Sequence, residues 1–414
     1  MNIIMMTNTY KPHVGGVANS VYNFKEELQK RGHRTLVVAP HFEGEYEEDD
    51  VIRVNALTNF NGSDFSVSLP SPIKLGDFKP DIIHSHHPFL LGSSAIRLAA
   101  LKKIPIVFTH HTLYERYTHY VPFDSQKLQE LTVNMVTEYC NLCSSVIAPS
   151  QSIKELLEKR GVEQHIDVVP TGIDEHLFDI DRDYEFEKEI GIPKDAFVIG
   201  HVSRLAKEKN QHFLSQAVAT FLKKRDDAFF VVAGDGDIKE ELEEIFIKEG
   251  VAKRAVFLGN REGEELIKLY KRFDVFAFSS TSETQGMVIA EALLASTPIV
   301  ALKASGVEEL VKSNKNGILI EKESKKSFIE AFENLYTMSK ERLENLKKSS
   351  KKSAKEYTLS RTTQKLIEIY KNRTLEKRDF RSSDIDIFDK TLRVLGAEYN
   401  LWKARAEAVK NSIT

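Results

Sequence analysis

The second half of the chain contains a basic pair whose residue types and spacing suit a phosphorylated ligand. Arg204 and Lys209 follow the apolar run at 197–202, and Lys207 is the alternative to Lys209. A guanidinium binds phosphate oxygens as a fork and an ammonium adds a point charge, so the two together can clamp a diphosphate. Taken alone, this segment is better explained as a solvated charged turn.

A second pattern places Glu283 and Glu291 on either side of Gly286. The glycine would let the backbone N–H groups of Gly286, Met287 and Val288 open a helix toward an anion. Glu291 would then lie about one turn inside that helix, where a carboxylate can accept hydrogen bonds from the vicinal hydroxyls of a ribose. Glu283 would meet sugar hydroxyls at the loop. Either glutamate alone could be surface charge, but the spaced pair is more specific.

Two adjacent glycines, Gly15 and Gly16, follow the first apolar run and precede a helical pattern. Paired glycines allow the backbone to approach a ligand closely, and the start of a helix offers unpaired N–H groups to an anion. The signal is weak by itself, because a Gly-Gly turn before a helix is common. The GxGxxG dinucleotide fingerprint is absent from this loop.

The histidines form a third group, because six of the thirteen fall close together: His84, His86, His87, His110, His111 and His119. A zinc site is disfavoured, since the two groups end different strands and no cysteine or carboxylate spacing completes it. We expect instead that the strands at 81–84 and 105–109 are neighbours whose ends line a polar cleft. Asp235-Gly236-Asp237 resembles a metal-binding DxD motif, but a plain tight turn after a strand is the favoured interpretation.

These residues need elements to position them, and the hydrophobic pattern supplies a series of strands and helices. Short apolar runs rich in β-branched residues alternate with amphipathic segments such as 17–31 and 125–143. This alternation predicts parallel sheets with right-handed crossovers, hence two consecutive doubly wound α/β units. The expected strands are 2–6, 35–39, 81–84, 105–109, 145–148, 197–202, 228–233, 255–258, 274–278 and 298–302.

The chain has 414 residues, more than one hydrophobic core of roughly 250–300 residues accommodates, so two domains are expected. We place an N-terminal Rossmann-like domain at 1–172 and a second at 195–355, joined by a charged connector. Residues 356–414 are expected to be C-terminal helices, the first crossing back to the N-terminal domain. The last of these helices, at about 383–411, contains Trp402 in an apolar stripe. This stripe is better suited to packing against the rest of the protein than to docking on a membrane.

Composition and charge narrow the class of protein. The net charge of −3 gives no basic field for nucleic acid, and two cysteines cannot form a disulfide framework. The N-terminus lacks the pattern of a signal peptide, and no apolar run approaches the ~20 residues of a membrane-spanning helix. We therefore expect a soluble, cytoplasmic protein, with the inner face of the plasma membrane as its one candidate membrane contact.

Together these motifs resemble glycosyltransferase family 4, the retaining, nucleotide-sugar-dependent enzymes of the GT-B fold. The resemblance covers residues 1 to about 372 and rests on Arg204 and Lys209, the spaced glutamates, Gly15-Gly16 and THHT at 109–112. It implies two Rossmann-like doubly wound domains facing a central cleft, plus a C-terminal helical extension. The N-terminal domain would bind the acceptor and the C-terminal domain the nucleotide sugar.

The resemblance also implies roles for individual residues. Arg204 and Lys209 match the pair that binds the donor diphosphate, and Glu291 matches the ribose-binding glutamate. Glu283 matches the residue that contacts the donor sugar, with the backbone of Gly286, Met287 and Val288 beside it. His111 matches the histidine near the sugar's 6-hydroxyl and the reaction centre, with His110 as the alternative. Gly16, supported by Gly15, matches the glycine near phosphate and acceptor. The expected catalytic residues are thus His111, Glu283, Arg204 and Lys209.

This sequence has Gln285 before Gly286, where glutamate-x-Phe-Gly is commoner in the family. THHTLYERYTHY at 109–120 and SETQG at 282–286 look like bacterial diacylglycerol α-glucosyltransferases. An aromatic-rich wall could hold an apolar acceptor, although a packed helix face explains it about equally well. The wall comprises Leu113, Tyr114, Tyr117, Tyr120, Val121 and Phe123, and the expected acceptor-binding residues are Tyr114, Tyr117, His119 and Tyr120.

The charge distribution does not support membrane docking through the N-terminal domain. Residues 1–180 contain 16 basic and 22 acidic residues, whereas residues 340–381 contain 14 basic and 6 acidic residues. Each lysine or arginine near an anionic membrane contributes about 1 kcal/mol to binding, so docking through the N-terminal domain would require that domain to be basic.

The function we expect is retaining transfer of a hexose, in first place glucose from UDP-glucose, to a membrane lipid such as diacylglycerol. An alternative is a mannosyl- or galactosyltransferase that acts on a polysaccharide, a glycan or a small soluble acceptor. An alternative of another class is a non-catalytic nucleotide-sugar-binding scaffold. No cofactor or metal is implied, because the nucleotide sugar is a substrate, and the expected partners are that donor and a lipid or glycan acceptor, without nucleic acid.

Overall fold

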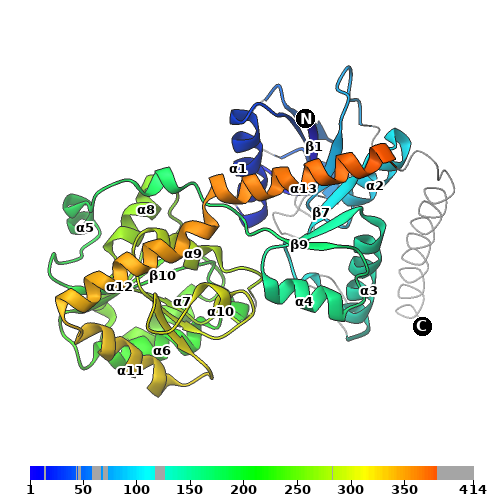
Figure 1. Cartoon of the computed structure of the whole chain (residues 1–414). Coiled ribbons are helices and arrows are strands. Elements are labelled where there is room, and N and C mark those ends of the chain that lie inside the picture. The colour runs from blue at the N-terminus through cyan, green and yellow to red at the C-terminus, as the bar shows by residue number, and fades with distance from the viewer. Residues whose placement is uncertain are drawn as a thin grey trace. The chain divides into compact units, whose positions relative to one another are not determined.

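The computed structural model describes two compact units. Its described residues are 1–379 except 14, 43, 45–47, 58–66, 69–72, 117–125 and 282. The first unit comprises Met1–Gly172 and the chain from Thr362 onward, and the second comprises Ile173–Arg361 (Figure 1). The charged stretch at 174–194, expected as a connector, is thus part of the second unit. The predicted final helix with Trp402 lies outside the described residues.

The first unit is built on a parallel sheet with strand order β3-β2-β1-β6-β7-β8-β9. Its strands are short, and all but the edge strands β3 and β9 are mostly buried, as β-branched runs covered on both faces should be. The strands are β1 (Asn2–Met6), β2 (Arg34–Pro40), β3 (Val51–Val54), β6 (Ile82–Ser85), β7 (Ile106–Thr109), β8 (Ser145–Ala148) and β9 (Ile166–Val168), and β4 (Ala56–Leu57) pairs separately with β5 (Val67–Ser68).

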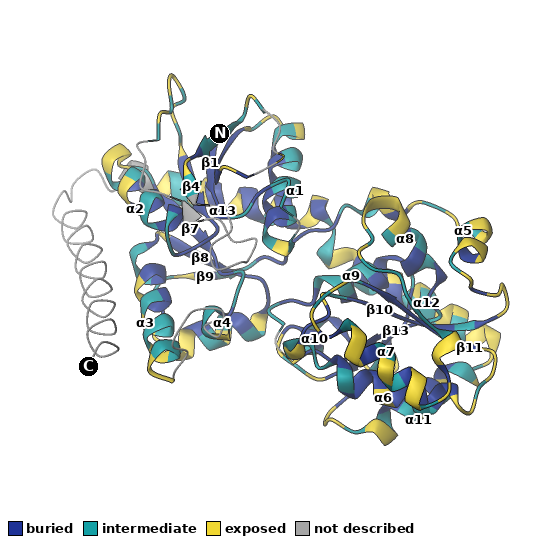
Figure 2. Cartoon of the chain, turned by 180° about the vertical axis from the view of Figure 1, so that it is seen from behind, coloured by how far each residue is buried: buried dark blue, intermediate teal, exposed yellow. Residues whose placement is uncertain are grey.

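The helices of the first unit cover this sheet. They are α1 (Gly16–Lys30), α2 (Leu91–Lys102), α3 (Gln126–Leu142), α4 (Gln151–Lys159) and α13 (Leu359–Asp379), which starts in the second unit. A hydrophobic core joins alternate strand residues such as Ile83 and Phe108 to α2, α3 and α4. Because side chains alternate along a strand, His84 and Thr109 point to the opposite face. Figure 2 shows the strands as buried and the outer helix faces as exposed.

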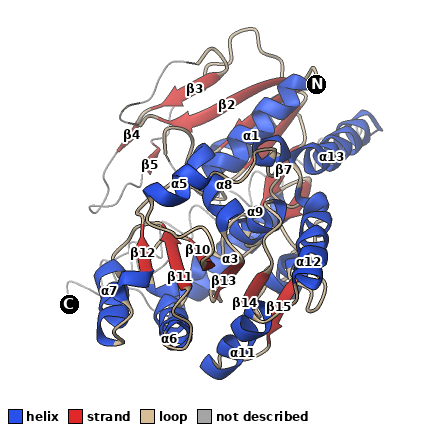
Figure 3. Cartoon of the chain, turned by 90° about the vertical axis from the view of Figure 1, so that its left-hand side faces the viewer, coloured by secondary structure: helices blue, strands red, loops and turns tan. Residues whose placement is uncertain are grey.

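The second unit repeats the scheme with the order β12-β11-β10-β13-β14-β15, a row of strands visible in Figure 3. Its strands are β10 (Phe197–Val202), β11 (Ala228–Ala233), β12 (Ala255–Phe257), β13 (Val275–Phe278), β14 (Ile299–Leu302) and β15 (Gly317–Ile320). Its α-helices are α5 (Tyr184–Glu189), α6 (Gln211–Leu222), α7 (Lys239–Lys248), α8 (Gly263–Arg272), α9 (Met287–Leu294), α10 (Val307–Leu310), α11 (Lys325–Tyr336) and α12 (Lys340–Ser353). Short 3-10 helices lie at Glu175–Phe178, Lys207–Lys209, Ala252–Arg254 and Ala354–Tyr357.

Separate hydrophobic cores cover the two faces of this second sheet. One joins the sheet to α6, α7 and α11, and the other joins it to α8, α9 and α10. The architecture is the doubly wound α/β arrangement predicted from the sequence, in both units. The sequence pattern missed the short pair β4 and β5, and it missed β3, β9 and β15, which lie at the edges of the two parallel sheets. An edge strand is buried less completely, so its hydrophobic pattern is weaker.

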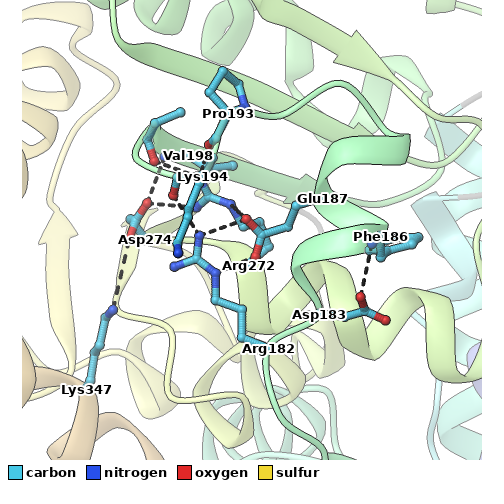
Figure 4. Close-up of polar contacts among 11 residues, drawn as sticks. Arg182, Asp183, Phe186, Glu187, Pro193, Lys194, Val198, Arg272, Asp274 and Lys347 are labelled. Carbon is cyan, nitrogen blue, oxygen red and sulfur yellow. Dashed lines mark hydrogen bonds and ion pairs between the residues drawn. The ribbon is translucent and has the colours of Figure 1, made fainter.

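A buried ion network fastens α5 and the chain before it to the second unit (Figure 4). Glu187 of α5 forms an ion pair with Arg272 at 2.9 Å, and both side chains are almost fully buried. Arg182 donates a hydrogen bond to Glu187 at 2.8 Å, and Asp274 lies 3.1 Å from Arg272 while accepting from the backbone N–H of Val198. Because Val198 and Asp274 lie where β10 and β13 begin, the network is at the edge opposite the strands' carboxyl ends.

Candidate functional site

Seven of the nine predicted donor-site residues lie in the second unit, after two neighbouring parallel strands. Arg204 and Lys209 follow β10, and Glu283 and Gly286 follow β13, which pairs with β10. Lys209 Nζ and Glu283 Oε1 are 2.6 Å apart, so the two loops meet. Arg204 forms an ion pair with Glu208 one turn along. Ligands of doubly wound sheets bind outside such carboxyl ends, and this edge offers both cations and carboxylates.

The loop that presents Arg204 is held by neighbours that the sequence did not single out. The Nε2 group of Gln211 donates to the carbonyl of Arg204 at 2.9 Å, and its Oε1 accepts from the N–H of Ala206 at 3.0 Å. A Cβ on Gly236 would lie 2.2 Å from the carbonyl oxygen of Leu205. The chain turns at Gly236–Lys239, where the N–H of Lys239 donates to the carbonyl of Gly236 at 3.2 Å, so the expected turn includes Gly236 and Asp237 and packs against the Arg204 loop.

The loop before α9 depends on two glycines. Gly286 has φ +76°, a left-handed conformation that glycine adopts without strain, and it caps the start of α9. Gly306, also at φ +75°, lies so close that a Cβ there would be 2.8 Å from the N–H nitrogen of Gln285 and the carbonyl oxygen of Thr284. Gly306 thus fixes the loop that presents Glu283. Sequence reasoning did not identify Gly306, because in the sequence it is only a single glycine that follows β14.

Glu291 lies on the second turn of α9, half-buried, and accepts a hydrogen bond from the hydroxyl of Tyr270 at 2.7 Å. Burial raises the pKa of this carboxyl to about 7, and the bond from Tyr270 opposes the rise only in part. The protonation state of Glu291 therefore changes near neutral pH. Tyr270 comes from α8, and nothing in the local pattern around Glu291 could have identified it.

Gly15 and Gly16 lie between β1 and α1 in the first unit. The backbone of Gly15 is extended and Gly16 is the first residue of α1, so neither conformation demands glycine. A Cβ on Gly16 would meet no atom within 4 Å. Packing within the described part of the chain therefore does not require a glycine at position 16.

The histidines collect at the carboxyl ends of two neighbouring strands, β6 and β7, which pair in parallel as predicted. His86 Nδ1 and His111 Nε2 are 2.9 Å apart, and the rings of His84 and His86 have centroids 4.0 Å apart. Burial lowers the pKa of His86 and His111 well below the usual value, and that of His110 to about 4. These rings are neutral at pH 7. Within the described ranges no group of three or more His, Cys, Asp or Glu side chains is arranged so that it could hold a metal ion.

Of the predicted acceptor residues, the structure describes Tyr114 alone. Its ring packs edge-on against Phe89 and His110 at the border of the first unit's core, so this side chain contributes to packing. Tyr117, His119 and Tyr120, together with Val121 and Phe123 of the aromatic wall, lie outside the described residues. Among the described helices, none has the length and hydropathy needed to cross a bilayer.

Comparison with known proteins identifies the family. The model for glycosyl transferases group 1 matches residues 183–353, and the model for glycosyltransferase family 4 matches residues 14–177. The chain is 32% identical over 337 residues to alpha-monoglucosyldiacylglycerol synthase of Streptococcus pneumoniae, covering 77% of this chain and 75% of that protein. It is 30% identical to the enzyme of the same name from Acholeplasma laidlawii, covering 78% and 85%. The chain belongs to glycosyltransferase family 4.

Other relatives and solved structures agree with this assignment. GDP-mannose-dependent alpha-mannosyltransferase of Corynebacterium glutamicum is 29% identical, with 78% of this chain and 77% of that protein covered. The Anabaena protein HepE, solved with UDP and glucose, superposes with a TM-score of 0.68 at 21% identity, covering 90% of this chain and all of that chain. The chain is thus a GT-B enzyme, a nucleotide-sugar-dependent hexosyltransferase, and the scaffold alternative does not hold.

Proposed function

We propose that this enzyme transfers glucose from UDP-glucose to a hydroxyl of a membrane lipid such as diacylglycerol, with retention of the anomeric configuration. The observation that carries the proposal is the 2.6 Å contact between Lys209 and Glu283. This contact brings together the side chain that we propose to bind the phosphate and the side chain that we propose to bind the sugar. The choice of glucose and lipid is supported by the two relatives named as alpha-monoglucosyldiacylglycerol synthases.

In this proposal the second unit binds the donor. Arg204 and Lys209 bind the diphosphate and stabilise the negative charge that develops as it leaves. Glu291 accepts hydrogen bonds from the ribose, and Glu283 from the sugar once Lys209 has turned to the phosphate. Two cationic side chains supply the charge that a divalent ion would otherwise provide, so we propose transfer without a metal. Activity retained in excess EDTA, after prior dialysis, would support this point.

The first unit supplies the acceptor side in the same proposal. His111 acts beside the transferring sugar, and Gly16 leaves space for a close approach of phosphate or acceptor. A lipid acceptor requires peripheral contact with a bilayer, at the cytoplasmic face where nucleotide sugars are available. The acidic N-terminal segment argues for an approach that does not depend on anionic lipid.

The decisive experiment offers three donors, UDP-glucose, UDP-galactose and GDP-mannose, each with diacylglycerol in phosphatidylcholine vesicles and with a panel of soluble sugars. We expect glucosyl transfer to diacylglycerol, with an α-linkage by proton NMR. Lys209→Ala serves as the inactive control. Transfer to soluble acceptors alone would contradict the lipid proposal, and a β-linked product would contradict retention.

A mannosyltransferase is the second candidate, favoured by the similarity to the GDP-mannose-dependent enzyme of Corynebacterium glutamicum. The same assay separates the two, because the donor that supports transfer identifies the sugar. If GDP-mannose supports at least tenfold faster transfer than UDP-glucose, the mannosyl function replaces the glucosyl one.

A further inference from the structure

Three histidine rings form a row in the first unit, from the middle of β6 to the residues after β7. The rings of His84 and His86 are 4.0 Å apart between centroids, and those of His86 and His111 are 5.2 Å apart and nearly parallel at 23°. His86 Nδ1 lies 2.9 Å from His111 Nε2. Two ring nitrogens at this distance form a hydrogen bond, in which one nitrogen carries the hydrogen and the other accepts it.

The surroundings decide which nitrogen holds that proton. His86 is buried and His111 is partly buried, and desolvation lowers the pKa of both rings well below the usual value, so each is neutral and has a single N–H. His86 Nε2 is buried and has no hydrogen-bond partner among the described residues. An orphaned buried N–H is rarer and more costly than an orphaned acceptor. The proton of His86 therefore belongs on Nδ1, where it is donated to His111 Nε2.

We propose that His86 is a positioning residue that holds His111 in the tautomer with its proton on Nδ1. In that tautomer Nε2 of His111 accepts the hydrogen bond from His86, and Nδ1 carries the proton. The ring therefore acts as a hydrogen-bond donor and not as a general base. The histidine then stabilises charge or a hydroxyl oxygen during transfer and does not remove the acceptor's proton. This inference rests on the proposed role of His111 beside the donor sugar.

The row is anchored at its other end by the C-terminal helix. Tyr370 of α13 contacts His84 Nδ1 through its hydroxyl at 2.6 Å, and Thr109 Oγ1 lies 2.6 Å from His84 Nε2. Both ring nitrogens of His84 are thus held by hydroxyl groups, and the ring of His86 packs at a tilt of 37° against this fixed ring. α13 consequently supports the position of His111, although Tyr370 lies 286 residues after His84 in the chain.

The test measures the tautomer directly. Protein labelled with ¹⁵N in its histidines is examined by long-range ¹H–¹⁵N correlation spectroscopy, and His111 is assigned by its absence in His111→Asn. We expect a protonated Nδ1 and an unprotonated Nε2 in the full-length chain. A protonated Nε2 on His111 would overturn the inference, whether or not the enzyme transfers glucose.

Variants of His86 link the tautomer to catalysis. His86→Phe keeps a stacked ring without the donor, so we expect a mixture of His111 tautomers and kcat lower by about 10- to 100-fold, with KM for UDP-glucose nearly unchanged. His86→Asn restores an N–H donor near the same place and should recover part of kcat. Tyr139→Phe is the control, since it removes a buried hydroxyl bonded to Ser85 Oγ and the Gly92 carbonyl without touching the three rings.

The two hypotheses fail in different ways. If His111 has the Nδ1 proton but no donor supports transfer, the proposed function fails while the tautomer assignment stands. If transfer occurs and His86→Phe leaves both the tautomer and kcat unchanged, the positioning role of His86 fails while the proposed function stands.

Discussion

At the scale of single residues, Glu291 is a carboxyl whose surroundings move its pKa into the neutral range. Its pKa near 7 makes it half protonated at neutral pH, and the proposed ribose contact needs the carboxylate, which accepts two hydrogen bonds. We predict that UDP-glucose binds about tenfold more weakly at pH 6 than at pH 8, in proportion to the ionised fraction. Isothermal titration calorimetry across this range measures the effect, and Glu291→Gln should bind weakly and without pH dependence.

The same pKa has a consequence for stability. Because the folded-state pKa is raised, the protonated form favours folding, so this contribution is complete below pH 4.5 and is lost as pH rises to about 7. Glu291→Gln should therefore raise the unfolding midpoint relative to the parent protein at pH 8 and not at pH 4. A shift of equal size at both pH values would contradict the assigned pKa.

Gly16 offers a separate test of a functional glycine. Since a Cβ there meets no atom within 4 Å and the residue is helical, Gly16→Ala should leave stability unchanged or raise it by about 0.4–1 kcal/mol. Transfer should nevertheless fall at least about tenfold, because a substrate approaching the backbone meets the new methyl group. Thermal unfolding and initial rates measure the two effects, and full activity in this variant would remove Gly16 from the site.

At the scale of elements, the Glu283 loop depends on Gly306, which does not belong to the predicted donor site. Gly306→Ala places a Cβ 2.8 Å from two backbone atoms of the loop, so we predict weaker UDP-glucose binding. Gly250→Ala is a matched control, because Gly250 has φ +74° and open space around it. Both variants bear the left-handed strain of about 1–2 kcal/mol, and only Gly306→Ala should change the dissociation constant.

The Glu187–Arg272 network makes a second prediction at this scale. Glu187→Ala leaves a buried guanidinium with one fewer partner, which should cost about 3–5 kcal/mol in the stability of the second unit. Lys248→Ala breaks an exposed pair with Glu244 and should cost about 0.5 kcal/mol or less. Urea unfolding of both variants tests the contrast, and similar small losses would mean that the network is dispensable.

At the scale of the whole molecule, the first unit is assembled from two distant parts of the chain. α13 supplies buried Leu366, Ile367 and Tyr370 to this unit, so its core is complete only when the C-terminal helix has docked. Leu366→Ala should cost about 2–5 kcal/mol, as loss of a buried leucine does. Leu375→Ala, on the exposed part of the same helix, should change stability by about 0.5 kcal/mol or less. Equal effects would show that α13 does not dock as described.

The sequence by itself determined the two doubly wound units, the pairing of β6 with β7 and the residues at the strands' carboxyl ends. It could do so because strand and helix periodicities are local, and parallel strands place the residues that follow them at one edge. Edge strands such as β3 and β15 were not predicted, because their hydrophobic pattern is weak.

Only the tertiary structure decided which side chains meet. The Lys209–Glu283 contact, the hydroxyl of Tyr270 on Glu291, the support of Gly306 and the row from Tyr370 to His111 join segments that are far apart in sequence. A hydrogen bond or a close approach between distant segments leaves no periodicity in either one. These pairings, and with them the pKa of Glu291 and the tautomer inferred for His111, follow from packing alone.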